Sequence, residues 1–475
     1  MKHAFFWKLM ERFGVQGTRF LVQIILARIL VPEHYGMLSI LVVFTNLADV
    51  LIQSSFYPAL VQNKDVTDED HSSVFWVCLA FSGVLYVLIF LTAPMILAFF
   101  GMSPALWPLR VLALVLFPGA LNSVQLAKAC REMDFYTVFR SNVAGNLISG
   151  VISIGIALAG GGLWALVAQM LLNVTVTAVV MLFTVHWRPA FVYRRQRVAV
   201  LLRYGWKLLA ASTLDILYQD LLSVVIGKGY GATALGYFNR GKQFPHFVTN
   251  AANGTVQSVM LPALSSEQDR LHRVKQTLRD SSNLIAYITL PIMAGLVAVA
   301  PNLIRLLLTE KWLPCVPYLR IMGLSLIFHP VHTCNMQAIN AIGRSDIALK
   351  LEALRTAAGI GFLAAAMVFF PSPLAIAGTY LAACAFGWLL NACFTARLLG
   401  YRFREQARDV LPSVALTCAM GLAVMAADLP GLPTPAALTL QVLLGVVTYV
   451  ILSILFRMAP FRTLLTLAKE TFAPK

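Results

Sequence analysis

Charged residues, and acidic ones above all, are scarce in this chain. Only 12% of its 475 residues are charged, and 21 acidic residues stand against 37 basic ones. Hydrophobic residues make up 59% of the sequence and the mean hydropathy is +0.76, so the chain carries more apolar surface than one soluble core could bury. This composition excludes a soluble globular protein and predicts a polytopic membrane protein.

Several chemical signatures are also missing. The seven cysteines form no Cys-x-x-Cys motif and have no histidine at metal-ligand spacing, so we interpret them as packing residues. The sequence contains no phosphate-cradling loop, zinc-binding helix or nucleophile elbow. We therefore expect a protein that is not an enzyme, with no catalytic residues, no metal and no resident cofactor. The first apolar run lacks a small-residue cleavage site, which predicts a retained first helix.

Long apolar runs take up most of the chain. About fourteen runs reach roughly 20 residues, the length that a helix needs to cross the hydrocarbon core. Because these runs are continuous and do not alternate, they predict an all-α integral membrane protein and argue against a membrane barrel. The predicted spans are 9–30, 36–58, 73–100, 106–127, 139–159, 162–185, 203–226, 236–261, 282–304, 317–340, 349–370, 374–396, 411–428 and 436–456.

The positions of the basic residues predict the orientation in the membrane. Most Lys and Arg residues fall in the termini and in the loops that follow even-numbered helices, as does the cluster between Arg188 and Arg203. Since cytoplasmic loops are enriched in basic residues, both termini are predicted to be cytoplasmic. The net charge of +16 is thereby assigned to membrane orientation, and no nucleic-acid partner is expected.

The sequence also repeats itself. The two copies lie about 200 residues apart and keep their order. Because the second copy begins six helices after the first, both cross the membrane in the same sense, and their pseudo-two-fold axis should run along the membrane normal. We predict a six-helix bundle in 1–200, a second in 201–400 and two peripheral helices in 401–475. The matching positions are Trp7, Gly36, Ala93-Pro94, Leu109-Arg110 and Asp134 with Trp206, Gly236, Ala300-Pro301, Leu319-Arg320 and Asp346.

Polar residues inside four predicted helices follow steps of three and four, which place them on one helix face. Because lipid-facing polar groups are costly, such faces predict a water-filled cavity between the two bundles. The stripes comprise Arg12, Gln16, Arg19 and Gln23 in the first helix, Ser39, Asn46, Asp49 and Gln53 in the second, Lys207, Asp215, Gln219 and the adjacent Asp220 in the seventh, and Gln243, His246, Asn250, Asn253 and Gln257 in the eighth.

Structural roles compete with this interpretation. Asn, Gln and Ser in membrane bundles often only hydrogen-bond a neighbouring helix, and Arg19 could form a purely structural ion pair with Asp215 or Asp49. His329 and His332 are interpreted as hydrogen-bonded bundle residues. The paired Leu-Arg motifs at the starts of the fourth and tenth helices favour a scaffold or gate role, and the turns around Asp134 and Asp346 favour helix capping.

Three segments resemble a known family. The segment from Leu26 to Gly36, LARILVPEHYG, and the later ALVQNKDVTDEDHSSVFW are similar to the first 80 or so residues of Wzx-type polysaccharide-export flippases, in the multidrug, oligosaccharidyl-lipid and polysaccharide (MOP) exporter superfamily. The segment ALGYFNRGKQF at 234–244 also resembles the family pattern. The resemblance implies a MATE-like pair of bundles that flips an undecaprenyl-diphosphate-linked oligosaccharide by alternating access, with helices one, two, seven and eight around the cavity.

Such a cargo fixes the chemistry expected of the site. A diphosphate calls for fixed cations, and guanidinium gives it forked hydrogen bonds. The candidate cations are Arg19 first, then Arg240 and Lys242. The amides that could meet sugar hydroxyls are Gln16, Gln23, Asn250 and Asn253.

A flipping cycle also needs a bias between its two states. A proton, a sodium ion or the membrane potential could supply it. The candidate ion-coupling residues are Asp49, Asp215 and Asp220, because a carboxylate in a dry cavity gains a proton or a cation at low cost.

Other functions compete with this one. A flippase for lipid-linked peptidoglycan precursors and a multidrug antiporter share the superfamily, although Arg19 and Arg240 favour an anionic cargo. A membrane glycan polymerase is disfavoured, because no predicted outward loop is long enough to bear a catalytic site, and the duplicated polar stripes argue most strongly against a purely structural scaffold. We expect a bacterial inner-membrane protein of exopolysaccharide, capsule or O-antigen synthesis, whose partners are a lipid-linked oligosaccharide, membrane lipids and other polysaccharide-assembly proteins.

Overall fold

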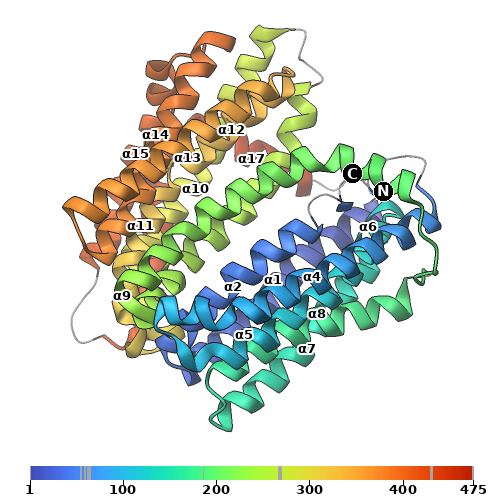
Figure 1. The fold of residues 1–475 in the computed structure, drawn as a ribbon. Coiled ribbons are helices and arrows are strands. Elements are labelled where there is room, and N and C mark those ends of the chain that lie inside the picture. The colour runs from blue at the N-terminus through green and yellow to red at the C-terminus, as the bar shows by residue number, and fades with distance from the viewer. Residues whose placement is uncertain are drawn as a thin grey trace. The chain divides into compact units, whose positions relative to one another are not determined.

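The computed structural model describes residues 2–53, 56–57, 60, 66–185, 187–265, 270–427 and 432–472. Among these, the side chains of 2–13, 53, 200–212, 214–219, 250–259, 261–263, 265, 345 and 467–472 are outside the description. Every regular element in the described residues is a helix (Figure 1). The all-α prediction is confirmed.

The chain divides into two compact units, Met1–Asn239 (unit 1) and Arg240–Lys475 (unit 2). The predicted division near residue 200 concerns the sequence repeat and stays a prediction. Unit 1 contains α1 (Lys2–Ile29), α2 (Pro32–Gln53), α4 (Asp68–Phe100), η1 (Ser103–Ala105), α5 (Leu106–Leu112), η2 (Ala113–Val115), α6 (Leu116–Arg131), α7 (Phe135–Leu158), α8 (Leu163–Thr184) and the first part of α9 (Arg195–Ser265).

Unit 2 begins within α9. It continues with α10 (Leu271–Leu308), η3 (Glu310–Cys315), α11 (Val316–Leu326), α12 (His329–Ala341), α13 (Ser345–Phe369), α14 (Pro373–Leu399), α15 (Phe403–Ala426), α16 (Thr434–Leu455) and α17 (Ala459–Phe472). The last of these was not predicted, because its sequence is too polar for a span.

Among the described residues, ten helices are long and apolar enough to cross a membrane. The chain is a multi-pass membrane protein. The other four predicted spans fall on α1, on α11 with α12, and on the two parts of α9, which Gly231 separates with a φ of 81°. Glycine tolerates this left-handed conformation because it has no Cβ. The count of fourteen spans stays a prediction.

Unit 1 is built around α7, which packs on both α1 and α8. Small residues on α7 allow this close approach. A Cβ added to Gly150 would lie 2.5 Å from a methyl group of Val22 on α1, and one added to Gly145 would meet Thr177 on α8. Val22 and Leu26 then join Ala165 in a buried apolar cluster.

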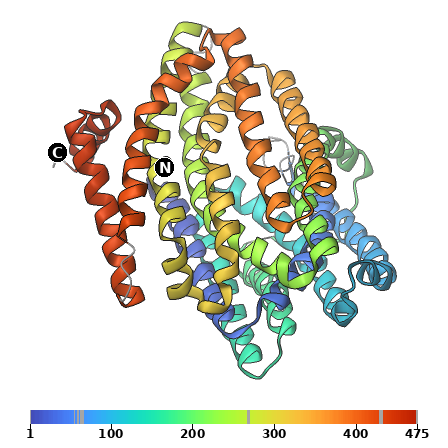
Figure 2. The ribbon, with the colours of Figure 1, turned by 90° about the vertical axis from the view of Figure 1, so that its left-hand side faces the viewer.

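Unit 2 is built around α10, which packs on α11, α12, α15 and α16. The Tyr449 hydroxyl donates to the Tyr287 carbonyl at 2.8 Å, and Asn302 donates to Gln441 at 3.1 Å. These buried hydrogen bonds join α16 to α10 within apolar surroundings. In Figure 2, α16 and α17 lie at one edge of unit 2. The prediction of two peripheral helices in 401–475 concerns α15 and α16 and stays a prediction.

The repeat is visible in a pair of matching turns. Met133 ends the α6 segment with a φ of 56°, and Gly343 ends α12 with a φ of 76°. In both turns the next amide donates back into the helix, from Asp134 to Ala129 at 2.9 Å and from Arg344 to Ile339 at 3.1 Å. The structural equivalent of Asp134 is therefore Arg344, two residues before the Asp346 that the sequence comparison pairs with it.

A second pair of equivalent features explains the repeated Ala-Pro and Leu-Arg motifs. Proline has no backbone N–H, so Pro94 in α4 leaves the carbonyl of residue 90 without its helical donor, and Pro301 in α10 does the same to residue 297. Arg110 Nε donates to the Phe90 carbonyl and Arg320 Nε to the Val297 carbonyl, each at 3.4 Å. Each arginine thus binds the carbonyl that a proline in its own unit has freed.

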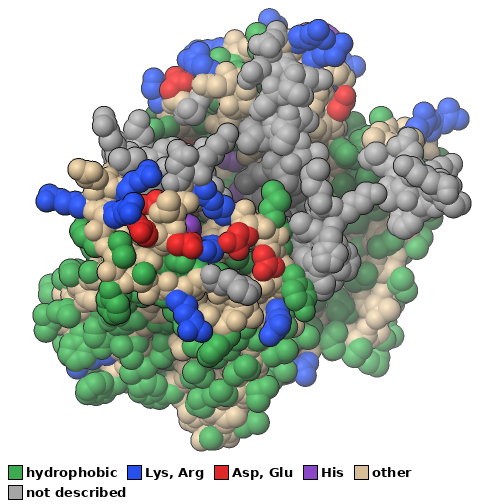
Figure 3. Space-filling view, turned by 90° about the vertical axis from the view of Figure 1, so that its right-hand side faces the viewer, with side chains coloured by type: hydrophobic (Ala, Val, Ile, Leu, Met, Phe, Trp, Pro, Cys, Tyr) green, Lys and Arg blue, Asp and Glu red, His purple; other side chains and the backbone are tan. Residues whose placement is uncertain are grey.

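The surface separates hydrophobic from charged side chains. On the face shown in Figure 3, basic and acidic side chains gather in bands, and a broad area of hydrophobic side chains adjoins them. Exposed apolar residues in α4, α8 and α16 include Leu91, Phe183 and Ile454, at 71%, 81% and 58%. Such side chains are suited to contact with lipid.

Candidate functional site

The polar stripe of α1 lies beside the face that packs on α7. Val22 and Leu26 are buried against α7 and α8, whereas Gln16 and Arg19 are exposed and Gln23 is half-buried. Arg19 thus lies on an exposed face of α1, within the span predicted for 9–30. This exposure suits a group that binds a ligand, although no described contact tests the substrate-binding assignment.

The candidate carboxylates occupy two helices of unit 1. Asp49 is half-buried on α2, beside the exposed Asn46, and Asp220 is half-buried on α9. The side chains of Asp215, Asn250 and Asn253 lie outside the described residues. The ion-coupling assignments and the structural alternative of an Arg19 ion pair therefore stay predictions.

Arg240 is the candidate cation with the best-defined surroundings. It follows Gly231 on α9, is only 5% exposed, and donates from Nη1 to Gln243. Its guanidinium carbon lies 5.2 Å from the centre of the Trp312 ring, a cation–π geometry. The next residue, Gly241, packs closely on the start of α11. Lys242 is half-buried on the same helix.

The repeated glycines make a reciprocal contact inside unit 1. A Cβ on Gly36 of α2 would collide with the carbonyl oxygen of Ala232, and a Cβ on Gly236 of α9 would collide with the carbonyl oxygen of Pro32. The two partners, like the two glycines, are 200 residues apart, at 32 and 232. The first turns of two equivalent helices therefore pack backbone to backbone around a local two-fold axis.

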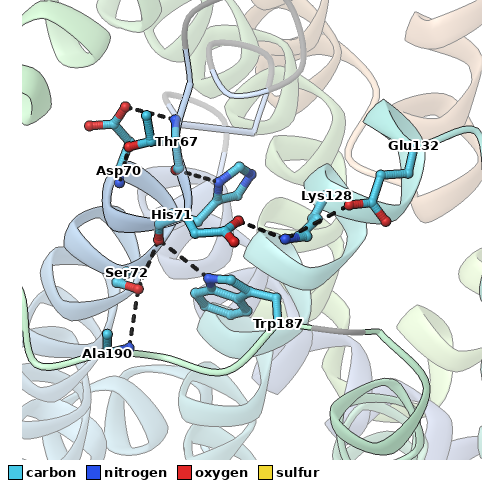
Figure 4. Close-up of polar contacts among 9 residues, drawn as sticks. Thr67, Asp70, His71, Ser72, Lys128, Glu132, Trp187 and Ala190 are labelled. Atoms are coloured by element: carbon cyan, nitrogen blue, oxygen red, sulfur yellow. Dashed lines mark hydrogen bonds and ion pairs between the residues drawn. The ribbon is translucent and has the colours of Figure 1, made fainter.

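A polar network joins three segments that the topology places on one side of the membrane. Thr67 caps α4 by accepting from the Asp70 amide at 3.3 Å, and Lys128 of α6 pairs with Asp68 at 2.6 Å (Figure 4). The Trp187 indole donates to the Asp68 carbonyl at 3.4 Å. Residues 66–70, 128–132 and 187–197 therefore lie together at one end of the unit 1 helices, and their side of the membrane stays a prediction.

Two arginines of the segment after α8 take part in the same network. Arg194 pairs with Glu69, and Arg197 Nε lies 3.8 Å from Asp70. The acidic start of α4 therefore neutralises part of the basic cluster on which the predicted orientation depends. The acidic residues also suit the positive end of the α4 dipole.

Unit 2 has a similar network between α10 and α15. Arg279 donates through two nitrogens to the two Asp409 oxygens, each at 2.6 Å, and Lys275 pairs with Glu405 at 2.9 Å. The Tyr401 hydroxyl donates to Asp409 at 2.9 Å, and burial with this bond raises the pKa of the phenol. Glu405 and Asp409 therefore tether the start of α15 to α10.

A cluster of titratable side chains inside unit 2 was not predicted as a site. It contains three histidines and one carboxylate–guanidinium pair: His246 on α9, His329 and His332 on α12, and Glu352 with Arg355 on α13. The two α12 rings are 5.8 Å apart, and the His246 ring is 6.3 Å from that of Tyr380 on α14. The spacing of His329 and His332 was visible in the sequence, but nothing there placed Glu352 beside them.

Within the described residues, no group of three or more His, Cys, Asp or Glu side chains is arranged to hold a metal ion.

Comparison with known proteins assigns the family. Residues 25–317 match the family described as "Polysaccharide biosynthesis protein". The chain belongs to this family. The succinoglycan biosynthesis transport protein ExoT of Rhizobium meliloti (strain 1021) is 24% identical over 359 residues, which are 75% of this chain and 72% of that protein. The resemblance seen in the sequence is confirmed.

Two solved structures show the fold. A structure of the lipid II flippase MurJ in an inward closed conformation matches with a TM-score of 0.78 at 14% identity, over 96% of this chain and 99% of that one. An inward-facing multidrug-resistance MATE transporter of the MOP superfamily matches with a TM-score of 0.64 at 18% identity, over 82% and 98%. The family member described here therefore has a MATE-like transporter fold.

Proposed function

We propose that the protein moves an undecaprenyl-diphosphate-linked oligosaccharide from the inner to the outer leaflet of the bacterial cytoplasmic membrane by alternating access. The observation that carries this proposal is the match to the polysaccharide biosynthesis family in a chain that has a transporter fold. ExoT, a relative across most of the chain, is named as a transport protein for succinoglycan biosynthesis. Transport, and not an enzymatic reaction, is the proposed activity.

The charges of the chain support an anionic cargo. Arg19 is exposed on a helix that otherwise packs through apolar residues, and a guanidinium keeps its charge and binds phosphate oxygens in pairs. A neutral or cationic drug would gain nothing from it. We place Arg19 at the diphosphate, Arg240 and Lys242 at a second contact, and the amides of Gln16, Gln23, Asn250 and Asn253 at the sugars.

The proposal includes the orientation of the chain in the membrane and the ion that drives its transport cycle. Both ends of the chain are proposed to lie in the cytoplasm, which the enrichment of basic residues in the termini and on the same side supports. Asp49, Asp215 and Asp220 are proposed to couple the cycle to H⁺ or Na⁺. Other membrane proteins of polysaccharide assembly would supply the loaded lipid on one side and consume it on the other.

Complementation tests the cargo class. The gene is expressed in one strain that lacks a polysaccharide flippase and in another that lacks the flippase for lipid-linked peptidoglycan precursors. Restored surface polysaccharide in the first strain alone supports the proposal. Rescue of the second strain alone would assign the protein to peptidoglycan synthesis, and a gain of drug resistance without either rescue would favour an antiporter.

A further inference from the structure

The cluster in unit 2 combines groups that exchange protons with groups whose charge is fixed. His332 accepts a hydrogen bond from Asn391 of α14, and His329 Nδ1 lies 3.1 Å from the Thr333 hydroxyl. Arg355 Nε donates to Glu352 at 3.0 Å, with exposed side-chain fractions of 15% and 34%. The interpretation of both histidines as hydrogen-bonded is confirmed, but four ionisable groups together exceed what helix packing requires.

The repeat shows that the packing does not require them. With the matching turns aligned, His329, Glu352 and Arg355 correspond to Gly119, Asn142 and Gly145 in the first half. The first half therefore builds the same helix pairs without any ionisable group at these three positions. At these three positions, only the second half carries ionisable side chains.

The helix facing Arg355 has adapted to the arginine. In the first half Gly145 packs on Thr177, whereas in the second half Arg355 packs on Gly387, where an added Cβ would lie 2.7 Å from Arg355 Cδ. The large and small partners are exchanged between equivalent positions. Gly387 thus leaves space for the aliphatic stem of Arg355 beside the histidines.

We propose that His329 and His332, with the Glu352–Arg355 ion pair, form a proton-binding site inside the second bundle. Its role in the transport cycle rests on the function proposed above, whereas its capacity to bind a proton does not. The proposed occupant is a proton, because imidazole is the side chain that exchanges protons near neutral pH.

The charges around the histidines explain how a proton would act. His329 lies within electrostatic range of Glu352 and Arg355, and His332 within range of Arg355. An imidazolium beside Arg355 would be repelled, and it would compete with the guanidinium for the single carboxylate of Glu352. Protonation is therefore favoured in a conformation in which Arg355 has moved away from Glu352, so the proton stabilises that conformation over the present one.

Titratable groups that interact electrostatically with the histidines or with Arg355 lie on three helices. The second part of α9 contributes His246 and Lys242, α13 contributes Glu352 and Arg355, and α14 contributes Tyr380 and Cys384. Glu352 is the carboxylate among these groups. Among these groups, Glu352 is thus the one carboxylate that an imidazolium, Lys242 and Arg355 could all pair with.

Histidine titration tests proton binding without any substrate. Ring-nitrogen NMR of ¹⁵N-histidine protein in nanodiscs, with the eight histidines assigned by single His→Gln variants, follows each ring between about pH 4 and pH 9. We expect the His329 titration midpoint to move to higher pH in Arg355→Gln, which removes the repelling charge, and to lower pH in Glu352→Gln. Gly387→Ala, which displaces the Arg355 stem, should move it in the same direction as Arg355→Gln.

The matched control is His272→Gln, which removes an exposed histidine at the start of α10. It should lose one signal and leave the His329 midpoint in place. A His329 midpoint that is the same in Arg355→Gln and Glu352→Gln, or no His329 titration in any variant, would overturn the proton site.

Transport tests the coupling. In proteoliposomes, His329→Gln should bring the ratio of initial flipping rates at about pH 6 and pH 8 to about one, whereas His272→Gln keeps the wild-type ratio. If His329→Gln does not fold, as judged by gel filtration, Gly387→Ala replaces it and should shift the pH profile upward. An unchanged profile in the folded variant refutes coupling, while failure of the wild type to flip any lipid-linked oligosaccharide refutes the proposed function instead.

Discussion

Arginine serves two different purposes in this chain. Arg110 and Arg320 donate to backbone carbonyls that prolines have freed, whereas Arg19 and Arg240 are proposed to contact the cargo. Arg19 is exposed on the polar stripe of α1, together with Gln16. The roles are distinguished by burial and partner, which residue type alone does not reveal.

Replacement of Arg19 tests the proposed diphosphate contact. We expect Arg19→Ala to lower the flipping rate by about tenfold or more, since one charge-assisted pair contributes about 1.5–3 kcal/mol, and Arg19→Lys to keep part of it. The rate is measured in proteoliposomes with folded protein. Arg28→Ala, an exposed arginine on the same helix, is the control and should retain transport. Equal rates in Arg19→Ala and the wild type would remove Arg19 from the site.

The acidic candidates have a separate prediction. Asp215→Asn should abolish the dependence of flipping on a proton or sodium gradient and leave the fold intact, because the amide cannot bind either ion as a carboxylate does. Asp134→Asn is a suitable control, because asparagine can still cap α7 through the Thr137 amide. Ion dependence that persists in Asp215→Asn would exclude this residue from coupling.

At the scale of elements, each half contains a proline and an arginine that act on the same backbone carbonyl. The sequence showed both repeated pairs, but not that Arg110 reaches the carbonyl four residues before Pro94. The sequence does show that Pro94 frees the carbonyl of residue 90, because a helical N–H bonds to the carbonyl four residues before it. It does not show that α4 and α5 pack so that Arg110 reaches this carbonyl. The break at Gly231 and the short 3₁₀ segment η2 likewise depend on local geometry that apolar runs do not encode.

A double substitution tests the link between Pro94 and Arg110. Arg110→Met leaves the Phe90 carbonyl without its donor and should destabilise the protein by about 1–3 kcal/mol. Pro94→Ala restores a helical N–H to that carbonyl, so the double variant should regain most of this loss. Thermal unfolding in detergent measures both. If the double variant is as unstable as Arg110→Met, the arginine stabilises the fold by another contact.

The whole molecule is organised by its repeat. From the sequence alone, helix positions, the duplication and the family resemblance were accessible, because spans and repeats leave regular patterns. The cluster around His329 could not be predicted in this way, because Glu352 and Arg355 lie on the next helix along the chain. Contacts between distant residues of this kind become visible only when the helices are packed.

The reciprocal glycine contact belongs to this scale. Gly36→Ala and Gly236→Ala should each destabilise the packed arrangement, and to a similar extent, because each Cβ would collide with the backbone of the equivalent helix. Gly83→Ala, where an added Cβ meets nothing within 4 Å, should leave the melting temperature unchanged or higher. Thermal unfolding compares the three. Unequal losses at Gly36 and Gly236 would show that the local two-fold contact is not shared evenly.

Direct observation of flipping tests the central claim. Purified protein is reconstituted with an undecaprenyl-diphosphate-linked oligosaccharide in both leaflets, and a glycosidase added outside cleaves only what it can reach. We predict that nearly all of the oligosaccharide becomes accessible with the wild type, and that only the outer-leaflet half does so in protein-free vesicles. Cleavage that stops at the outer-leaflet half in the presence of folded wild-type protein would contradict the assignment as a flippase.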